Sequence, residues 1–223
     1  MDKLIDQNGI GNFKEVTNSI FIADSIFSKE HCNEILEEFK NEEKWNVAKI
    51  SIAKENKTGK DDIIGVVDIS QRNAFNVTFK DFDMSKKPRT LQSLVKLQKQ
   101  VSSFTTNEFG LEFNQFGNEQ LIKYPQGGLF KAHTDTHRNN SHRAFTIILY
   151  LNDDFEGGET DFPNLNYKCE PKIGRALIFP STELHCGMPA NRGEKKIIVF
   201  WGFYPGENNN KEKKSNYFNP QIH

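Results

Sequence analysis

Residues 131–135 read Lys-Ala-His-Thr-Asp, and a further histidine, His185, ends the stretch Phe-Pro-Ser-Thr-Glu-Leu-His at 179–185. Side chains at positions i and i+2 of an extended strand point to the same side. His133 and Asp135 can therefore present an imidazole and a carboxylate to one point. His185 has to arrive on a different strand to join them. The stretch thus predicts a fold in which distant strands meet around this point.

Two histidines and one carboxylate on one side of a metal are the ligand set of many non-haem Fe(II) sites. We therefore interpret His133, Asp135 and His185 as candidate metal ligands. His137, at i+2 from Asp135, and His142 compete for the role. His137 falls in a polar, turn-like run, so we expect it to face solvent. The structural alternative is a polar strand end capped by Asp135.

The chain around this stretch consists of short apolar segments separated by glycine-containing turns. Periodicity predicts strands over 121–124, 143–151, 175–179 and 195–204. The first half instead contains two segments with apolar residues at helical spacing, over 29–43 and 90–107. Helices followed by many short strands predict a mainly β fold with flanking helices (α+β), a sandwich or barrel covered by helices on one side.

The same change in pattern divides the chain into three parts. Residues 1–110 form a helix-and-strand support region of the same domain, 111–205 form the β core, and 206–223 form a polar C-terminal tail. Residues 52–62 are charged and contain glycine, which predicts a solvated loop. Because such loops often cover sites, we consider 52–72 a candidate substrate lid.

Composition bounds the classes of function. The chain has 223 residues, 36% hydrophobic residues and a net charge of −1, which disfavours disorder and a polyanionic partner. No apolar run approaches the roughly 20 residues that a membrane span needs. The first residues are charged, and the three cysteines are widely spaced, which suits a reducing compartment. The sequence therefore predicts a cytoplasmic protein without membrane or nucleic-acid partners, and it does not predict an oligomeric state.

Two adjacent lysines head the most apolar late segment. Lys195 shares its parity with Ile197, Val199 and Trp201, while Lys196 has the opposite parity. A lysine on an inward face is costly unless an anion meets it. Periodicity does not decide which lysine faces inward. If it is Lys195, a buried dianionic ligand is the natural partner.

Several motifs in this half of the chain together resemble one known family. They are Tyr124-x-x-Gly127-x-x-Phe130-x-x-His133-x-Asp135, Arg143-x-x-Thr146, Tyr150-Leu-Asn152, Gly157-Gly-Glu-Thr160-x-Phe-Pro163, Lys172-x-Gly174-x-Ala176-Leu-Ile-Phe179, and His185 followed by Lys195. In combination they resemble the core of the prolyl 4-hydroxylase-like 2-oxoglutarate/Fe(II)-dependent dioxygenases. The resemblance covers roughly residues 119–204 and is weak over residues 1–110.

This resemblance implies a fold and a set of roles. The fold would be the double-stranded β-helix, or jelly roll. His133, Asp135 and His185 would hold Fe(II). The co-substrate 2-oxoglutarate would chelate the metal and pair with Lys195 through its distal carboxylate. Tyr124 and Thr146 would donate hydroxyl hydrogen bonds to it, and O2 would be the oxidant, with ascorbate as reductant.

The implied function is hydroxylation of an unactivated C–H bond, with a prolyl residue of a peptide or protein as the leading substrate. The alternatives are a hydroxylase of a free amino acid, tailoring of a small peptide, and a non-catalytic jelly-roll binding module. Arg143 and Arg72 are candidate substrate contacts. Tyr150 and Trp201 are expected to lie in the core. Nucleic-acid dealkylases that share this core carry arginines in the segment after the distal histidine. Here no arginine follows Arg192, so the resemblance disfavours that function.

Overall fold

The computed structural model describes residues 12–55, 61–110, 113–137 and 140–204. Two helices, α1 (Lys29–Glu37) and α2 (Pro88–Phe109), precede most of the strands. Short 3-10 turns lie at Phe79–Asp81, Met84–Lys86 and Pro163–Leu165. None of the helices within these ranges combines the length and the apolar composition that crossing a membrane requires.

A large antiparallel sheet forms the centre of the molecule. Its strands run in the order β1 (Lys14–Thr17), β2 (Ile20–Ala23), β13 (Ala176–Pro180), β9 (Arg143–Tyr150), β16 (Lys195–Phe203), β7 (Phe116–Tyr124), β6 (Phe75–Thr78) and β3 (Asn46–Val47). A smaller sheet has the order β12 (Tyr167–Cys169), β11 (Thr160–Phe162), β14 (His185–Gly187) and β8 (Phe130–His133). Two strand pairs complete the set, β10 (Glu156–Gly157) with β15 (Ala190–Arg192) and β4 (Ile50–Glu55) with β5 (Asp61–Val66).

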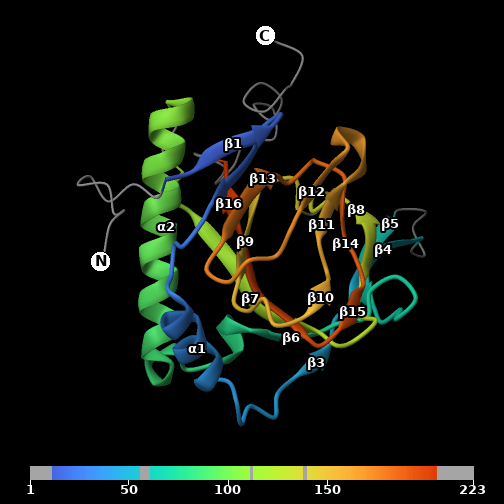
Figure 1. Ribbon diagram of the computed structural model, residues 1–223. Helices are drawn as coiled ribbons and strands as arrows, with labels where there is room; N and C mark the ends of the chain where they lie inside the picture. Colours follow the sequence, from blue (N-terminus) through green and yellow to red (C-terminus); the bar gives the residue numbers. More distant parts are fainter. Residues whose placement is uncertain (1–11, 56–60, 111–112, 138–139, 205–223) are drawn as a thin grey trace.

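The two faces of the large sheet pack against different partners. Figure 1 shows α1 and α2 on one side and the smaller sheet on the other. On β16, Ile198 and Phe200 join the core beneath the helices, while Ile197 and Val199 join the core between the sheets. Strict alternation along a strand places successive side chains on opposite faces. The predicted mainly β fold with flanking helices, a jelly roll, is confirmed.

Helix α1 is shorter than the predicted segment 29–43. Ser28 caps its N-terminus, because the Ser28 side chain accepts a hydrogen bond from the His31 backbone N–H. The helix ends at Glu37, and the side chain of the next residue, Glu38, bonds to a different helix. The Glu38 carboxylate accepts hydrogen bonds from the backbone N–H groups of Arg89 and Thr90 in the first turn of α2. Helical spacing alone does not reveal that the side chain of Glu38, just after α1, caps the first turn of α2.

The predicted loop over 52–62 is wrong where the structure describes it. Residues 52–55 and 61–62 lie in the antiparallel pair β4–β5, while 56–60 lie outside the described residues. Ile52 pairs with Ile64 across the two strands, so apolar alternation stabilises the pair in spite of its charged residues. The tail at 206–223 lies outside the described residues, and the three-part division remains a prediction.

Candidate active site

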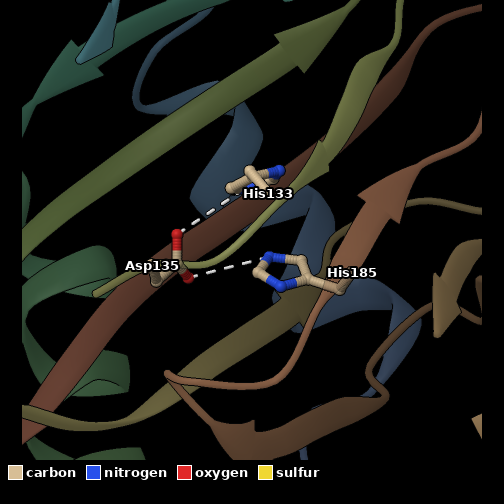
Figure 2. A group of neighbouring side chains, drawn as sticks. All are labelled: His133, Asp135 and His185. Carbon is tan, nitrogen blue, oxygen red and sulfur yellow. Dashed lines mark ion pairs between the residues drawn. The ribbon is translucent and has the colours of Figure 1, made fainter. Parts of the chain in front are cut away.

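The three candidate metal ligands come together at the end of the smaller sheet. His133 is the last residue of β8, His185 is the first of β14, and the two face each other in the strand register. Asp135 lies in the bend after β8, where its backbone N–H donates to the Ser181 carbonyl. The strand predicted through 133–135 thus ends at His133. Figure 2 shows the Asp135 carboxylate facing both imidazoles, with a dashed line to each.

The distances fit a single small ion. Asp135 Oδ1 lies 3.6 Å from His133 Nε2, and Asp135 Oδ2 lies 3.7 Å from His185 Nε2. One ligand atom from each of the three residues falls within 4.8 Å of the others. Neither competing histidine belongs to this group. His137 contacts Asn140, and the His142 ring packs against Phe203.

Both ligand histidines are held in the tautomer that a metal needs. His133 Nδ1 lies 2.7 Å from the Lys131 carbonyl, and His185 Nδ1 lies 3.0 Å from the Glu183 carbonyl. A carbonyl only accepts, so Nδ1 carries the proton and the Nε2 lone pair is available. Burial lowers the pKa of His185 to about 4, so its ring is neutral at physiological pH.

Asp135 is kept ionised by its surroundings. Burial opposes ionisation, but His185, His133 and the Thr146 hydroxyl outweigh it and hold the pKa of Asp135 well below its usual range. The Thr146 hydroxyl donates to Oδ2 at 2.7 Å, and the Trp201 indole N–H donates to the same oxygen at 3.1 Å. Two imidazoles that present Nε2 and one oriented carboxylate suit a divalent transition metal such as Fe(II).

Trp201 is a positioning residue that its sequence context did not predict. It is buried, as a core residue should be, but its indole N–H also fixes a candidate metal ligand. Its shared parity with Lys195 is the signal that places it on the inner face. Thr146 also differs from expectation, because its hydroxyl proton is directed at Asp135. Its contact with 2-oxoglutarate therefore remains a prediction.

We expect Trp201→Phe to weaken metal binding while preserving the fold. Phenylalanine fills most of the indole volume but cannot donate to Asp135. Loss of a hydrogen bond to a metal ligand typically costs about 10-fold in metal affinity. Calorimetric titration with Fe(II) under anaerobic conditions measures the change. Trp45→Phe is the matched control, because Trp45 packs beneath Lys123 and does not line the cavity.

Lys195 faces the inner cavity, which answers the question that periodicity left open. Only 2% of it is exposed, and its Nζ donates to the Gly158 carbonyl at 2.8 Å. Lys196 points away and pairs with Glu194. Burial lowers the pKa of Lys195 to about 8. Within the described residues Lys195 makes no ion pair, so the cavity contains a buried cation that lacks an anion.

Two hydroxyl residues line the cavity together with this lysine. Tyr124 is opposite Lys195 in the β7–β16 register, and Lys195 Nζ lies 4.4 Å from the centre of its ring. Thr160, on β11, is buried and lines the same cavity, where its hydroxyl shares a hydrogen bond with Tyr150. Nothing in its sequence context predicted a role for Thr160 beyond membership of the motif. Tyr150 is a core residue, as expected.

The ligand cluster and Lys195 open into one cavity of about 740 Å3. Both predicted substrate residues line it. The Arg143 guanidinium lies 3.7 Å from the centre of the Trp201 ring and donates to the Asp135 carbonyl. The Arg72 guanidinium lies 4.5 Å from the centre of the Phe130 ring and donates to the Lys49 carbonyl. The volume is in the range typical of small-molecule sites.

Comparisons with known proteins agree with this geometry. Residues 119–203 match the model of the 2OG-Fe(II) oxygenase superfamily. A putative prolyl 4-hydroxylase of Acanthamoeba polyphaga mimivirus is 32% identical over 115 residues, which are 42% of this chain and 48% of the relative. Probable prolyl 4-hydroxylase 3 of Arabidopsis thaliana is 31% identical over 116 residues, covering 37% and 40%. The chain spans about half the length of the curated relatives it matches, or less.

Solved structures show the same fold. A Pseudomonas putida prolyl-4-hydroxylase superposes with a TM-score of 0.66 at 18% identity, covering 85% of this chain and 95% of that one. A viral collagen prolyl hydroxylase from Paramecium Bursaria Chlorella virus-1 gives 0.57 at 22% identity, covering 83% and 96%. Residues 119–203, which carry the candidate metal ligands and Lys195, thus resemble the 2OG-Fe(II) oxygenase superfamily. The relatives that match this part of the chain are named as prolyl 4-hydroxylases.

Proposed function

We propose that the protein is an Fe(II)- and 2-oxoglutarate-dependent dioxygenase that hydroxylates a prolyl residue of a peptide or protein. The observation that carries this proposal is one cavity with two facing sets of groups. His133, Asp135 and His185 supply a metal-ligand set, and the buried Lys195 supplies a cation for a dicarboxylate. A non-catalytic binding module would have no need of both.

The residues would share the work as follows. His133, Asp135 and His185 would hold Fe(II), which supplies the oxygen chemistry when bound with 2-oxoglutarate and O2. Lys195 would bind the distal carboxylate of 2-oxoglutarate through a charge-assisted hydrogen bond, which is strong in a closed cavity. Tyr124 and Thr160 would line the co-substrate and keep water away. Trp201 would orient Asp135.

A peptide substrate is supported by one of the structural neighbours. A prolyl hydroxylase from Trichoplax adhaerens, in complex with a hypoxia-inducible factor oxygen degradation domain peptide fragment, superposes with a TM-score of 0.61 at 19% identity. The residues that line the cavity run from the candidate metal ligands to Ile50 and Ser51 at the start of β4. We further propose a cytoplasmic location, which the free cysteines Cys32, Cys169 and Cys186 favour.

The test is a coupled assay with purified protein, Fe(II), 2-oxoglutarate and ascorbate. We expect succinate to form, and proline-containing peptides to gain the mass of one oxygen atom. Amino-acid analysis of the product distinguishes hydroxyproline from other hydroxylated residues. Removing the metal with a chelator should abolish both signals, and adding Fe(II) back should restore them. Protein that binds neither Fe(II) nor 2-oxoglutarate would rule the proposal out.

A further inference from the structure

The cavity carries far more positive charge than the chain as a whole. The protein has a net charge of −1. Yet the side chains that line the cavity include one carboxylate, Asp135, and a larger set of basic groups: Lys49, Arg72, Lys131, Arg143 and Lys195. A cleft lined by one sign of charge focuses the field and attracts ligands of the opposite sign.

The proposed cofactors account for only part of this charge. Asp135 would bind the metal, and Lys195 would bind the distal carboxylate of 2-oxoglutarate. The other basic residues form what we call the basic rim: Lys49, Arg72, Lys131 and Arg143. In the described part of the chain, no member of the rim forms a salt bridge. Asp135 interacts electrostatically with Arg143, and Asp68, whose pKa is lowered mainly by Ser70 and only last by Lys131, interacts weakly with Lys131.

The two arginines of the rim are fixed by aromatic rings and keep unused hydrogen-bond donors. Arg143 stacks on Trp201, and Arg72 stacks on Phe130. Each donates to one backbone carbonyl, Arg72 also hydrogen-bonds to the Tyr124 hydroxyl, and the Nε of each arginine is buried without a hydrogen-bond partner. A guanidinium offers five donors in a fixed fork that matches a carboxylate. Each arginine therefore keeps donors for an incoming acid.

These arginines also lie close to the candidate metal ligands. Trp201 donates to Asp135, and the Phe130 ring stacks on His133 with centroids 3.5 Å apart. Each guanidinium is thus one aromatic ring away from a ligand. Lys49 and Lys131 are exposed at the outer edge of the cavity. The backbone N–H of Lys131 donates to the carbonyl of Gln71, the residue before Arg72. The charge therefore extends from the metal site outward.

We propose that the substrate is an acidic peptide segment, with Asp or Glu carboxylates adjacent to the residue that reacts. This rests on the proposed function and names its substrate class. Arg72 and Arg143 bind the carboxylate nearest the metal, and Lys49 and Lys131 bind those further along. A single-stranded nucleic acid fits less well, because it binds by stacking bases on aromatic rings. Here Phe130 lies between Arg72 and His133, and Arg143 covers Trp201.

The experiment compares peptides of equal length whose proline is flanked by Asp and Glu, by Ser and Gln, or by Lys. Fluorescence anisotropy measures binding to protein loaded with Mn(II) and 2-oxoglutarate, and to unloaded protein. We expect the acidic peptide to bind at least about 10-fold more tightly than the neutral one. The difference should shrink between about 0.05 and about 0.5 M salt, because salt screens the charges. Hydroxylation should follow the same order.

A charge-swapped variant makes the test specific to the rim. In the Lys49→Glu, Lys131→Glu double variant, the preference should shift from the acidic peptide to the lysine-flanked one. Lys99→Glu, on the outer face of α2, is the matched control and should leave the preference unchanged. Equal affinity for all three peptides in wild type and double variant would overturn the inference. So would tighter binding of single-stranded DNA of equal charge.

Failure of the inference differs from failure of the proposed function. If the protein forms succinate and hydroxylates neutral peptides as well as acidic ones, the oxygenase proposal stands and the acidic substrate is wrong. If the protein binds neither Fe(II) nor 2-oxoglutarate, the oxygenase proposal fails. Peptide binding to the unloaded protein then still decides whether the basic rim selects acidic segments.

Discussion

Replacing Asp135 with alanine is expected to abolish hydroxylation and to weaken Fe(II) binding at least about 100-fold, more than the loss of an outer hydrogen bond alone. Asp135 is the only anionic group of the candidate ligand set. It is also the acceptor that Thr146 and Trp201 share, so its oxygens are fixed before a metal arrives. Anaerobic calorimetric titration with Fe(II) and succinate formation provide two independent measurements.

The control for this variant is Asp81→Ala. Asp81 is an exposed carboxylate outside the cavity, and its removal changes the net charge by the same amount. It should leave both Fe(II) affinity and turnover near the wild-type values. If Asp135→Ala retained full Fe(II) affinity, the carboxylate ligand would have to be a different residue, and the assignment of His133 and His185 would need revision with it.

Replacing Lys195 with methionine is expected to have two opposite effects. The affinity for 2-oxoglutarate should fall at least about 100-fold, because a hydrogen-bonded charge pair in a dry cavity contributes several kcal/mol. The thermal stability of the protein without ligand should rise instead. Lys195 is 2% exposed and lacks an ion-pair partner in the described residues, whereas methionine fills a similar volume without charge.

The sign of the stability effect follows from the pKa of Lys195. Burial lowers this pKa from 10.5 to about 8 in the folded state. The unfolded chain therefore binds the proton more tightly, so stability is lost as pH falls from 10.5 to 8 and the cost is complete below 8. The difference corresponds to about 3 kcal/mol. Thermal denaturation at pH 7 should show a higher Tm for Lys195→Met than for wild type.

The same pKa predicts how co-substrate binding depends on pH. Only the protonated Lys195 attracts a carboxylate, so the Kd of 2-oxoglutarate should rise roughly tenfold per pH unit above about 8. Lys196→Met is the control, because Lys196 pairs with Glu194 outside the cavity. Equal losses of 2-oxoglutarate affinity in the two methionine variants would show that Lys195 does not bind the co-substrate.

Local patterns predicted the features that depend on neighbouring residues in the chain. The spacing of His133 and Asp135 predicted a shared side, and it holds even though the strand ends at His133. Alternation along 195–204 placed Lys195 and Trp201 on one face. Such periodicities survive because every residue of a strand obeys them.

Features that depend on a distant partner were not predictable in this way. The Glu38 side chain, just after α1, caps α2, and the hydroxyl of Thr146 donates to Asp135, which the bend after β8 brings next to it. The pair β4–β5 forms in spite of its charged composition, because Ile52 and Ile64 pair across the two strands. Each case is settled by tertiary contacts, which composition and spacing do not encode.

The imidazole tautomers have a consequence for how freely this site can change its sequence. His133 and His185 each donate from Nδ1 to the carbonyl of the residue two positions earlier, Lys131 and Glu183. A carbonyl is present whatever the side chain. Substitutions at 131 can therefore alter the charge at the outer edge of the cavity, and substitutions at 183 can change that side chain, while both imidazoles keep their metal-binding tautomer. The partner that the edge of the cavity binds can thus change in evolution while His133 and His185 keep their metal-binding geometry.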